Sequence, residues 1–251
     1  MTKIYCFANH KGGTGKSTTT LNIAAGLSNI KKKVLLVDLD PQTNLTIMLG
    51  IYQKQKHTLY ELMSDECQIS DCTIKINDYL NLIPSSLDLS SIEIEIANTR
   101  GRENKLKNIL VQVNSSYDFI LIDAPPSMGL LTINGLVASK KVFIPVQTEF
   151  IALNGLTKFV DIVNKVKALN QNLEIGGIIA TRYDNRKILN RSVVEQIRSL
   201  YGNILLKTII RENIAVAESV ASGLDIFSYA PKSYGAEDYL SLVNEIIKLE
   251  R

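Results

Sequence analysis

Cysteine is scarce in this sequence, with three thiols among 251 residues: Cys6, Cys67 and Cys72. A small and odd number of cysteines excludes a disulfide framework. Four residues separate Cys67 from Cys72, a spacing that matches neither a zinc knuckle nor a redox pair. We therefore expect three ordinary reduced side chains, consistent with a reducing compartment such as the cytoplasm.

Long apolar runs are missing as well. No stretch approaches the roughly 18 apolar residues that indicate a membrane span, and the first apolar run, "IYCFAN", is short and strand-like rather than a signal peptide. No linker rich in Pro, Gly or Ser divides the chain, which favours one domain over residues 1–251. The formal charge of +3 is too small by itself to indicate a nucleic-acid partner, although a local basic face would suffice.

What is present is an alternation of short β-branched runs with longer helical patterns, which indicates βαβ units and a parallel sheet. We predict strands at Ile4–Ala8, Val34–Asp38, Tyr79–Ile83, Phe119–Asp123, Val142–Val146, Ile175–Thr181 and Ile204–Ile209. We predict helices at Ser17–Ser28, Ser86–Ala97, Glu103–Val113, Leu130–Ala138, Ile151–Leu169, Arg191–Tyr201, Asn213–Ser222 and Ala236–Leu249. "VLLVD" and "FILID" are apolar on both faces, as buried parallel strands are. The predicted fold class is α/β: a doubly wound, mostly parallel sheet with helices on both faces.

A glycine-rich segment, "ANHKGGTGKSTTT", joins the first predicted strand to the first predicted helix. It contains the Gly-Lys-Ser of a Walker A loop, G-x-x-x-x-G-K-[ST], but His10 stands where the first glycine belongs, and a second lysine, Lys11, follows it. Glycines allow backbone N–H groups to point at phosphate oxygens, and the helix adds its positive end. Lys16 would bridge the β- and γ-phosphates, and the Ser17 hydroxyl would bind Mg²⁺. The predicted phosphate-binding residues are Lys11, Gly12, Gly13, Thr14, Gly15, Lys16, Ser17 and Thr18.

Three acids end predicted strands at the same edge of the sheet, where such folds bind ligands. Asp123 ends "FILID", the position of a Walker B aspartate, and Asp38 and Asp40 lie in "VDLDPQTN". Acids at the ends of buried strands are costly unless they are paired or bind metal. We predict Ser17, Asp38 and Asp123 as the metal-binding residues, with a helix cap as the alternative role for Asp38. Asp40 would orient the attacking water.

Three segments together, "KGGTGKST", "VDLDPQTN" and "LIDAPPS", resemble the ParA/MinD family of ATPases, whose deviant Walker A loop reads K-G-G-x-[GT]-K-[ST]. The resemblance implies a P-loop NTPase fold and a homodimer in the ATP state. It also implies that Lys11 reaches the nucleotide of the other subunit, which makes Lys11, Lys16 and Asp40 the expected catalytic residues.

Within this family the chain is most similar to ParA/Soj-type partition ATPases, on "DPQTN", "PVQTEFIALNGL" and the segment from "IRENIAVAES" to "YGAEDY". The resemblance implies nucleotide contacts from Arg182 and Arg211. Ile210 replaces a proline of many relatives and Ala215 stands near an expected second arginine, so the adenine contacts are open. The phosphate loop begins by position 10, which leaves no room for the N-terminal helix-turn-helix extension of larger relatives.

Cations cluster in the carboxyl-terminal half of the sequence, as binding to DNA phosphates requires. The candidate DNA-binding residues are Arg186, Lys187, Arg191, Arg198, Lys207 and Arg211. For any one of them, a solvated helix face is the alternative. Lys31–Lys33 lie between the first helix and second strand, and we interpret them as a surface turn favoured by the helix dipole.

Several alternatives remain at this point. The main one is a MinD-like ATPase that positions protein cargo or docks on membrane through its last helix, although Leu240, Val243 and Ile247 have core-facing spacing there. A metal-carrying relative such as the nitrogenase iron protein would need a cysteine in "DAPPSMG", which has none. A P-loop metabolite kinase would leave Lys11 and "VDLD" unexplained.

The resemblance implies an ATP-hydrolysing protein of chromosome or plasmid partition. Mg²⁺ and ATP or ADP would be its ligands, and non-specific DNA and a ParB-like stimulating protein its partners. Hydrolysis would be slow until that protein acts. We expect a cytoplasmic, nucleoid-associated location without stable membrane association.

Overall fold

The structure, a computed structural model, describes residues 2–149 and 152–249. In this part of the chain seven strands form one sheet in the order β3-β4-β2-β5-β1-β6-β7. The strands are β1 (Lys3–Phe7), β2 (Val34–Asp38), β3 (Ile74–Lys75), β4 (Leu80–Ile83), β5 (Phe119–Asp123), β6 (Lys141–Gln147) and β7 (Glu174–Thr181). All neighbours pair in parallel except β3 and β4.

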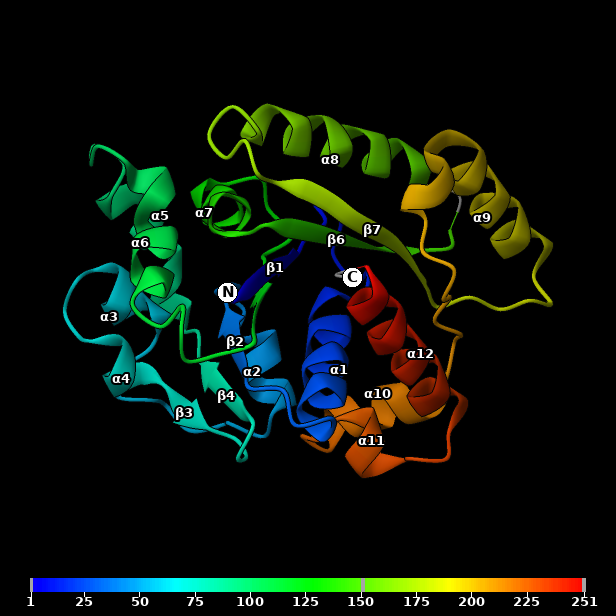
Figure 1. Ribbon diagram of the computed structural model, residues 1–251, viewed down its shortest axis with the longest axis horizontal. Coiled ribbons are helices and arrows are strands. Elements are labelled where there is room, and N and C mark those ends of the chain that lie inside the picture. The colour runs from blue at the N-terminus through cyan, green and yellow to red at the C-terminus, as the bar shows by residue number, and fades with distance from the viewer. Residues whose placement is uncertain (1, 150–151, 250–251) are drawn as a thin grey trace.

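Helices cover both faces of this sheet (Figure 1). The α-helices are α1 (Lys16–Asn29), α2 (Asn44–Met48), α3 (Leu59–Met63), α4 (Ile69–Cys72), α5 (Ile92–Glu95), α6 (Lys105–Val111), α7 (Leu130–Ala138), α8 (Ala152–Val166), α9 (Ile188–Tyr201), α10 (Ile214–Ala221), α11 (Ile226–Tyr229) and α12 (Tyr234–Lys248). The 3₁₀-helices are η1 (Leu87–Ser90), η2 (Arg102–Asn104) and η3 (Gly202–Ile204). The predicted doubly wound α/β fold is confirmed.

Two hydrophobic cores lie on opposite faces of the sheet because side chains alternate along each strand. Tyr5 and Phe7 of β1 face the core that includes α1 and α12. Cys6 of the same strand, and Ala8 just after it, face the core that includes α7, α8 and α9. Burial on both faces explains why the central strands are apolar throughout.

The predicted strand Ile204–Ile209 is wrong. Leu205 forms only an isolated bridge with Ile178, and the N–H groups of Lys207 and Thr208 donate to the Glu245 carboxylate at 2.7 and 2.8 Å. The N–H of Leu206 still donates to the Ile178 carbonyl of β7 at 2.9 Å. Because the next two donors are used by a side chain of α12, this pairing does not continue and no strand forms.

Other predicted boundaries need smaller corrections. The predicted helix Ser86–Ala97 is two short elements, η1 and α5. Ile151, the first residue of the predicted helix Ile151–Leu169, lies outside the described residues, and α8 begins at Ala152. The short elements α2, α3, α4 and β3 are absent from the sequence-based prediction, because so few residues leave no readable periodicity.

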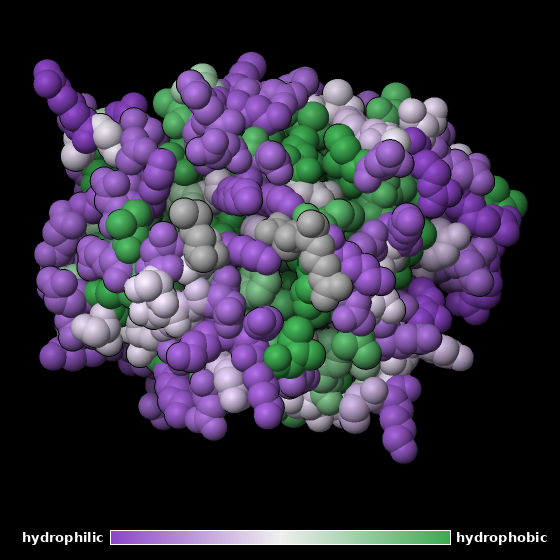
Figure 2. Space-filling view, viewed as in Figure 1, coloured by the Kyte–Doolittle hydropathy of each residue, from purple (hydrophilic) through white to green (hydrophobic). Residues whose placement is uncertain are grey.

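The last helix packs onto α1 with one face. Of the three residues predicted to face the core, Val243 is 1% exposed and Ile247 is partly buried against the core, but Leu240 is 47% exposed and lies on the outer face, so that part of the prediction is wrong. Within the described residues no helix combines the length and apolar character needed to cross a bilayer. On the face in Figure 2, hydrophobic side chains form separate groups among hydrophilic ones.

Candidate nucleotide and magnesium site

The glycine-rich loop joins β1 to α1 at the carboxyl edge of the sheet. Gly13 and Gly15 have φ angles of +74° and +85°, which side chains with a Cβ rarely adopt. Two side chains from neighbouring strands hold the loop: the Thr181 hydroxyl donates to the Thr14 carbonyl at 2.9 Å, and the Gln147 amide donates to the Gly13 carbonyl. Thr181 and Gln147 belong to strands that are distant in sequence, so only the fold identifies them as loop supports.

The first turn of α1 is open to an anion. Gly15 is its N-cap and provides no side-chain acceptor, and the turn contains no acidic residue. The N–H groups at the start of this 14-residue helix therefore lack a capping side chain. A phosphate group fits this end of the helix on charge and hydrogen bonding.

The two lysines of the loop lie in different environments. Lys16 is 6% exposed, and its ammonium donates to the Lys11 carbonyl at 3.3 Å. Burial lowers the pKa of Lys16, while the Asp123 and Asp40 carboxylates partly oppose that shift. The Lys11 ammonium instead lies 3.4 Å from the Glu149 carboxylate, with a third of the side chain exposed. Lys16 is thus buried beside the acids of the site, and Lys11 is accessible from outside.

Asp38 and Asp123 are register partners on β2 and β5, and both are fully buried. The two oxygens of Asp38 accept hydrogen bonds from Asp40 and Thr46. Asp123 accepts from the Thr20 hydroxyl at 3.4 Å, but its Oδ2 atom has no hydrogen bond from any described residue. Burial, reinforced by the negative charge of Asp38, holds the pKa of Asp123 well above its ordinary value. The Ser17 hydroxyl and the positive charge of Lys16 act in the opposite direction.

These residues fit a magnesium ion. The Ser17 hydroxyl and the unpartnered Asp123 oxygen are hard oxygen donors of the kind that Mg²⁺ prefers. No cluster of three or more His, Cys, Asp or Glu side chains forms a metal cage in the described part of the chain. A magnesium ion at this site would therefore depend on nucleotide phosphates and water for its other ligands.

A pocket of about 360 Å³, here called the phosphate pocket, surrounds the glycine-rich loop. Its lining includes Asp40, Gln42 and Asn44 from the segment after β2, together with Pro126 from the segment after β5. The remaining lining residues are Gly12, Gly13, Thr14, Gly15, Lys16, Ser17, Thr18 and Met48. The predicted phosphate residues from Gly12 to Thr18 and the predicted water-orienting Asp40 thus share one pocket.

A second pocket, of about 510 Å³, adjoins the loop at Gly13, Gly15 and Thr18 and extends toward α10. Arg182, Arg211 and the buried Ile210 line it. Its other lining residues are Thr181, Glu212, Asn213, Ile214, Val216, Ala217, Val220 and Tyr239. The mixture of apolar walls and a few polar groups suits a base and ribose. Sequence reasoning missed most of these residues, since apolar positions on a short helix carry no motif.

Comparison with known proteins agrees with this geometry. Residues 2–175 match a family described as "AAA domain". "Chromosome-partitioning ATPase Soj" of Treponema pallidum is 43% identical over 250 residues, which cover 98% of each chain. Soj of Bacillus subtilis, named as a sporulation initiation inhibitor, is 42% identical with the same coverage. The chain belongs to the ParA/Soj/MinD family of ATPases.

Solved structures of similar proteins carry the expected ligands. A putative plasmid partition protein of Borrelia burgdorferi bound to AMPPNP has a TM-score of 0.84 and 27% identity, covering 100% of this chain and 98% of that one. Cobyrinic acid a,c-diamide synthase of Mycobacterium smegmatis, with ADP and magnesium, has a TM-score of 0.88 and 31% identity, covering 99% and 95%. Like these proteins, the present ParA/Soj-family chain has a P-loop NTPase fold.

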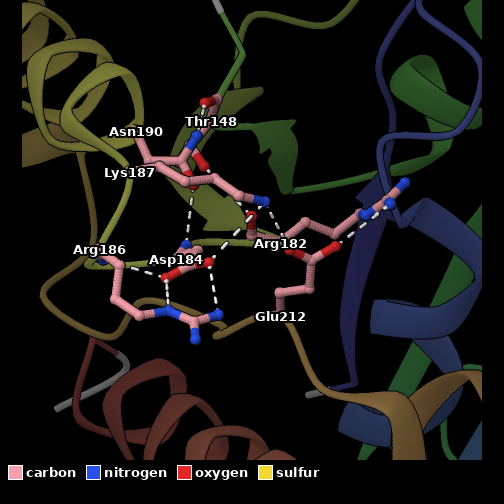
Figure 3. A network of polar contacts seen from close by, with 7 residues as sticks. All are labelled: Thr148, Arg182, Asp184, Arg186, Lys187, Asn190 and Glu212. Atoms are coloured by element: carbon pink, nitrogen blue, oxygen red, sulfur yellow. Dashed lines mark hydrogen bonds and ion pairs between the residues drawn. The ribbon is translucent and has the colours of Figure 1, made fainter.

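The predicted DNA-binding cations of this ParA/Soj-family ATPase fall into two groups. Carboxylates pair with Arg186 and Lys187 (Figure 3): the Arg186 guanidinium contacts Asp184 with two nitrogens at 2.9 Å, and Lys187 lies 2.9 Å from Glu212. Glu212 also lies 3.5 Å from Arg182. These ion pairs reduce the net positive charge around the network.

Arg211 belongs to the same paired group. Its Nε donates to the nearly buried Asp238 at 3.0 Å, its Nη2 lies 2.7 Å from Glu237, and its guanidinium stacks 4.5 Å from the Tyr234 ring. These contacts raise the pKa of Arg211 above its ordinary value and tie the loop after β7 to α12. Much of the arginine's hydrogen-bonding capacity is therefore used within the ATPase fold.

The second group consists of Arg191 and Arg198 on α9 and Lys207 after η3. All three are exposed, and none forms an ion pair with a described residue. Of the predicted DNA contacts, these three cations are the ones that form no ion pair within the described part of the chain.

Proposed function

We propose that this chain is a DNA-partition ATPase whose ATP-bound dimer holds DNA non-specifically and whose hydrolysis releases it. The observation that carries the proposal is the placement of the two lysines in one phosphate loop. Lys16 is buried beside Asp123 and Asp40, whereas the Lys11 side chain is about a third exposed and its ammonium lies 3.4 Å from the exposed Glu149 carboxylate. A cation presented outward from a nucleotide site suits a second subunit facing that site.

Within one subunit, the open first turn of α1 and the Lys16 ammonium would bind the phosphates. Ser17 and Asp123 would hold Mg²⁺ directly. Asp38 would contribute through its hydrogen bonds to Asp40 and Thr46 or through a water molecule. The ion would neutralise charge on the β- and γ-phosphates. Asp40 would orient water toward the γ-phosphate from the shared pocket. Arg182 and Arg211 would border the nucleoside.

In the dimer, Lys11 would leave Glu149 and bind the phosphates of the other subunit. The exchange is inexpensive because an exposed ion pair contributes only about 0–1 kcal/mol. A second cation on the phosphates would stabilise the transition state as an arginine finger does. Turnover would stay slow until a ParB-like partner completes the site.

DNA would contact Arg191, Arg198 and Lys207, the exposed cations that form no ion pair with a described residue. Arg186, Lys187 and Arg211 would contribute less because carboxylates neutralise them. Chromosome and plasmid relatives support the partition class, and 43% identity to Soj exceeds the 31% to the diamide synthase. The expected location is the cytoplasm, on the nucleoid. One domain over residues 1–251 would carry all of these functions.

The test uses Asp40→Ala, which should bind ATP but not hydrolyse it and so accumulate the ATP dimer. Binding of this variant to a random-sequence duplex is measured by fluorescence anisotropy with ATP and with ADP across a salt series. The proposal expects binding with ATP only, weakening steeply with salt. Lys16→Ala is the matched control and should not respond to ATP.

Two results would redirect the assignment. An ATP dimer, seen by light scattering, that binds no DNA would favour a MinD-like ATPase that positions membrane or protein cargo. Unchanged turnover in Asp40→Ala would remove Asp40 as the water-orienting residue.

A further inference from the structure

The connection that follows β2 carries three residues of the phosphate pocket: Asp40, Gln42 and Asn44. It ends in α2, a helix of only five residues. So short a helix is not stable by itself, because nucleating a turn costs more than its few hydrogen bonds return. The position of Asp40 relative to the phosphate loop must therefore be fixed by contacts to the rest of the fold.

Asp38 provides these contacts at both ends of the connection. One carboxylate oxygen accepts the N–H of Asp40 at 3.2 Å. The other accepts the N–H of Thr46 at 2.9 Å and the Thr46 hydroxyl at 2.7 Å. Asp38 is fully buried and Thr46 is 5% exposed, so water does not compete for these bonds.

The Thr46 hydroxyl makes a second bond that fixes its orientation. The N–H of Ser85, which follows β4, donates to the Thr46 oxygen at 3.1 Å. Because β4 is the neighbour of β2, this hydroxyl links the carboxyl ends of two adjacent strands to α2. Thr46 itself does not line the phosphate pocket, so any effect on ATP would pass through Asp38 and the connection.

We propose that Thr46 is a positioning residue for ATP hydrolysis, whose hydroxyl holds the β2–α2 connection so that Asp40 faces the phosphate loop. This inference rests on the proposed role of Asp40 as the water-orienting carboxylate. It predicts that the hydroxyl matters for the rate of hydrolysis and little for ATP affinity, since Thr46 is not among the phosphate-pocket residues.

The experiment compares the full chain with Thr46→Val, which removes the hydroxyl at nearly constant volume, and Thr46→Ser, which keeps it. Steady-state hydrolysis gives kcat and KM, titration with a fluorescent ATP analogue gives Kd, and urea unfolding gives stability. For Thr46→Val we expect kcat to fall on the order of 10- to 100-fold, as for other residues that orient a catalytic group, with Kd changed less than about 3-fold. Thr46→Ser should recover most of the lost rate.

Thr46→Ala gives the same comparison if Thr46→Val does not fold, because it keeps the backbone bond to Asp38. A folded variant without the hydroxyl that retains the parent kcat would overturn the proposal. So would parallel losses of kcat and ATP affinity that Thr46→Ser does not rescue. Asp40→Ala measured beside these variants separates the two ideas: if it loses turnover while Thr46→Val keeps it, only the positioning role fails.

Discussion

Asp38 and Asp123 lie side by side as register partners at the carboxyl ends of β2 and β5, yet the hydrogen bonding of their carboxylate oxygens differs. Both oxygens of Asp38 accept hydrogen bonds from its own connection, while one buried oxygen of Asp123 has no partner among the described residues. An unsatisfied buried carboxylate oxygen is costly, which suits a group that binds a cation during function. Of the predicted metal-binding acids, Asp123 is the better candidate for direct contact.

The burial of these acids predicts a pH dependence of stability. Burial raises the pKa of Asp38 from 3.8 to about 7, so between these values the folded chain binds more protons than the unfolded chain. The free energy of unfolding should therefore fall as pH rises from about 4 to about 7, by on the order of a few kcal/mol from this group, since each pKa unit corresponds to about 1.4 kcal/mol. Asp123 acts in the same direction.

Urea unfolding at several pH values, without nucleotide and with a metal chelator, measures this dependence. His10, whose pKa burial lowers, has the opposite effect below its ordinary pKa, so the informative quantity is the difference between the parent and Asp38→Asn. The variant should show a shallower decrease across this window. Identical slopes would show that Asp38 is not protonated near neutral pH in the folded chain.

Lys16→Ala should abolish the stabilisation of the protein by ATP. Lys16 is the buried cation of the phosphate pocket, and without it the phosphates lose their charged contact. For the parent, Mg²⁺ with ATP at about 100 times Kd should add about 2.7 kcal/mol to the free energy of unfolding, and the variant should gain almost none. Thermal melts with and without nucleotide decide the matter; an equal rise in both proteins would refute the role of Lys16.

Lys11→Ala should separate nucleotide binding from dimerisation. The variant loses only an exposed ion pair with Glu149, so its stability should change by less than about 1 kcal/mol and its monomer should still bind ATP. The ATP-dependent dimer and hydrolysis should both be lost. Light scattering and phosphate release test this, with Glu149→Gln as a control that removes the ion pair but keeps the lysine. Normal turnover in Lys11→Ala would exclude a cross-subunit role.

Thr43 offers a stabilising substitution. Its φ of +57° places a β-branched residue in the left-handed region, and its side chain makes no capping hydrogen bond at the start of α2. Asn adopts this conformation more readily than a β-branched residue, so Thr43→Asn should add about 1 kcal/mol to the free energy of unfolding. Thr43→Val keeps the β-branch and should give no gain in the same urea titration.

Arg198→Ala should weaken DNA binding more than Arg186→Ala. Arg198 is exposed and forms no ion pair with a described residue, whereas the Arg186 guanidinium is held by Asp184. In an Asp40→Ala background with ATP, loss of one phosphate contact should reduce the slope of log affinity against log salt by about 1. Equal effects of the two substitutions would mean that the ion pair opens when DNA binds.

Some of this molecule follows from local sequence alone. The central strands Val34–Asp38 and Phe119–Asp123 and the helix Leu130–Ala138 have the predicted bounds, because each is long and periodic or uniformly apolar. The phosphate loop can likewise be predicted from the sequence, because its geometry is set by glycines, a lysine and a hydroxyl within a few consecutive positions. The wrongly predicted strand Ile204–Ile209 shows the limit: it has strand composition, but Glu245 of α12 accepts the N–H groups of Lys207 and Thr208.

By itself the sequence determined the fold class, the phosphate loop and the acids at the strand ends, because each depends on neighbours in the chain and on strand direction. Only the tertiary structure decided which oxygen of which acid is unsatisfied, which cations are neutralised and which residues enclose the pocket that extends toward α10. Those properties depend on contacts between residues such as Asp38 and Thr46, or Arg211 and Asp238, whose geometry no local pattern encodes. Local chemistry thus specifies the kind of site, and packing specifies how each charge in it is used.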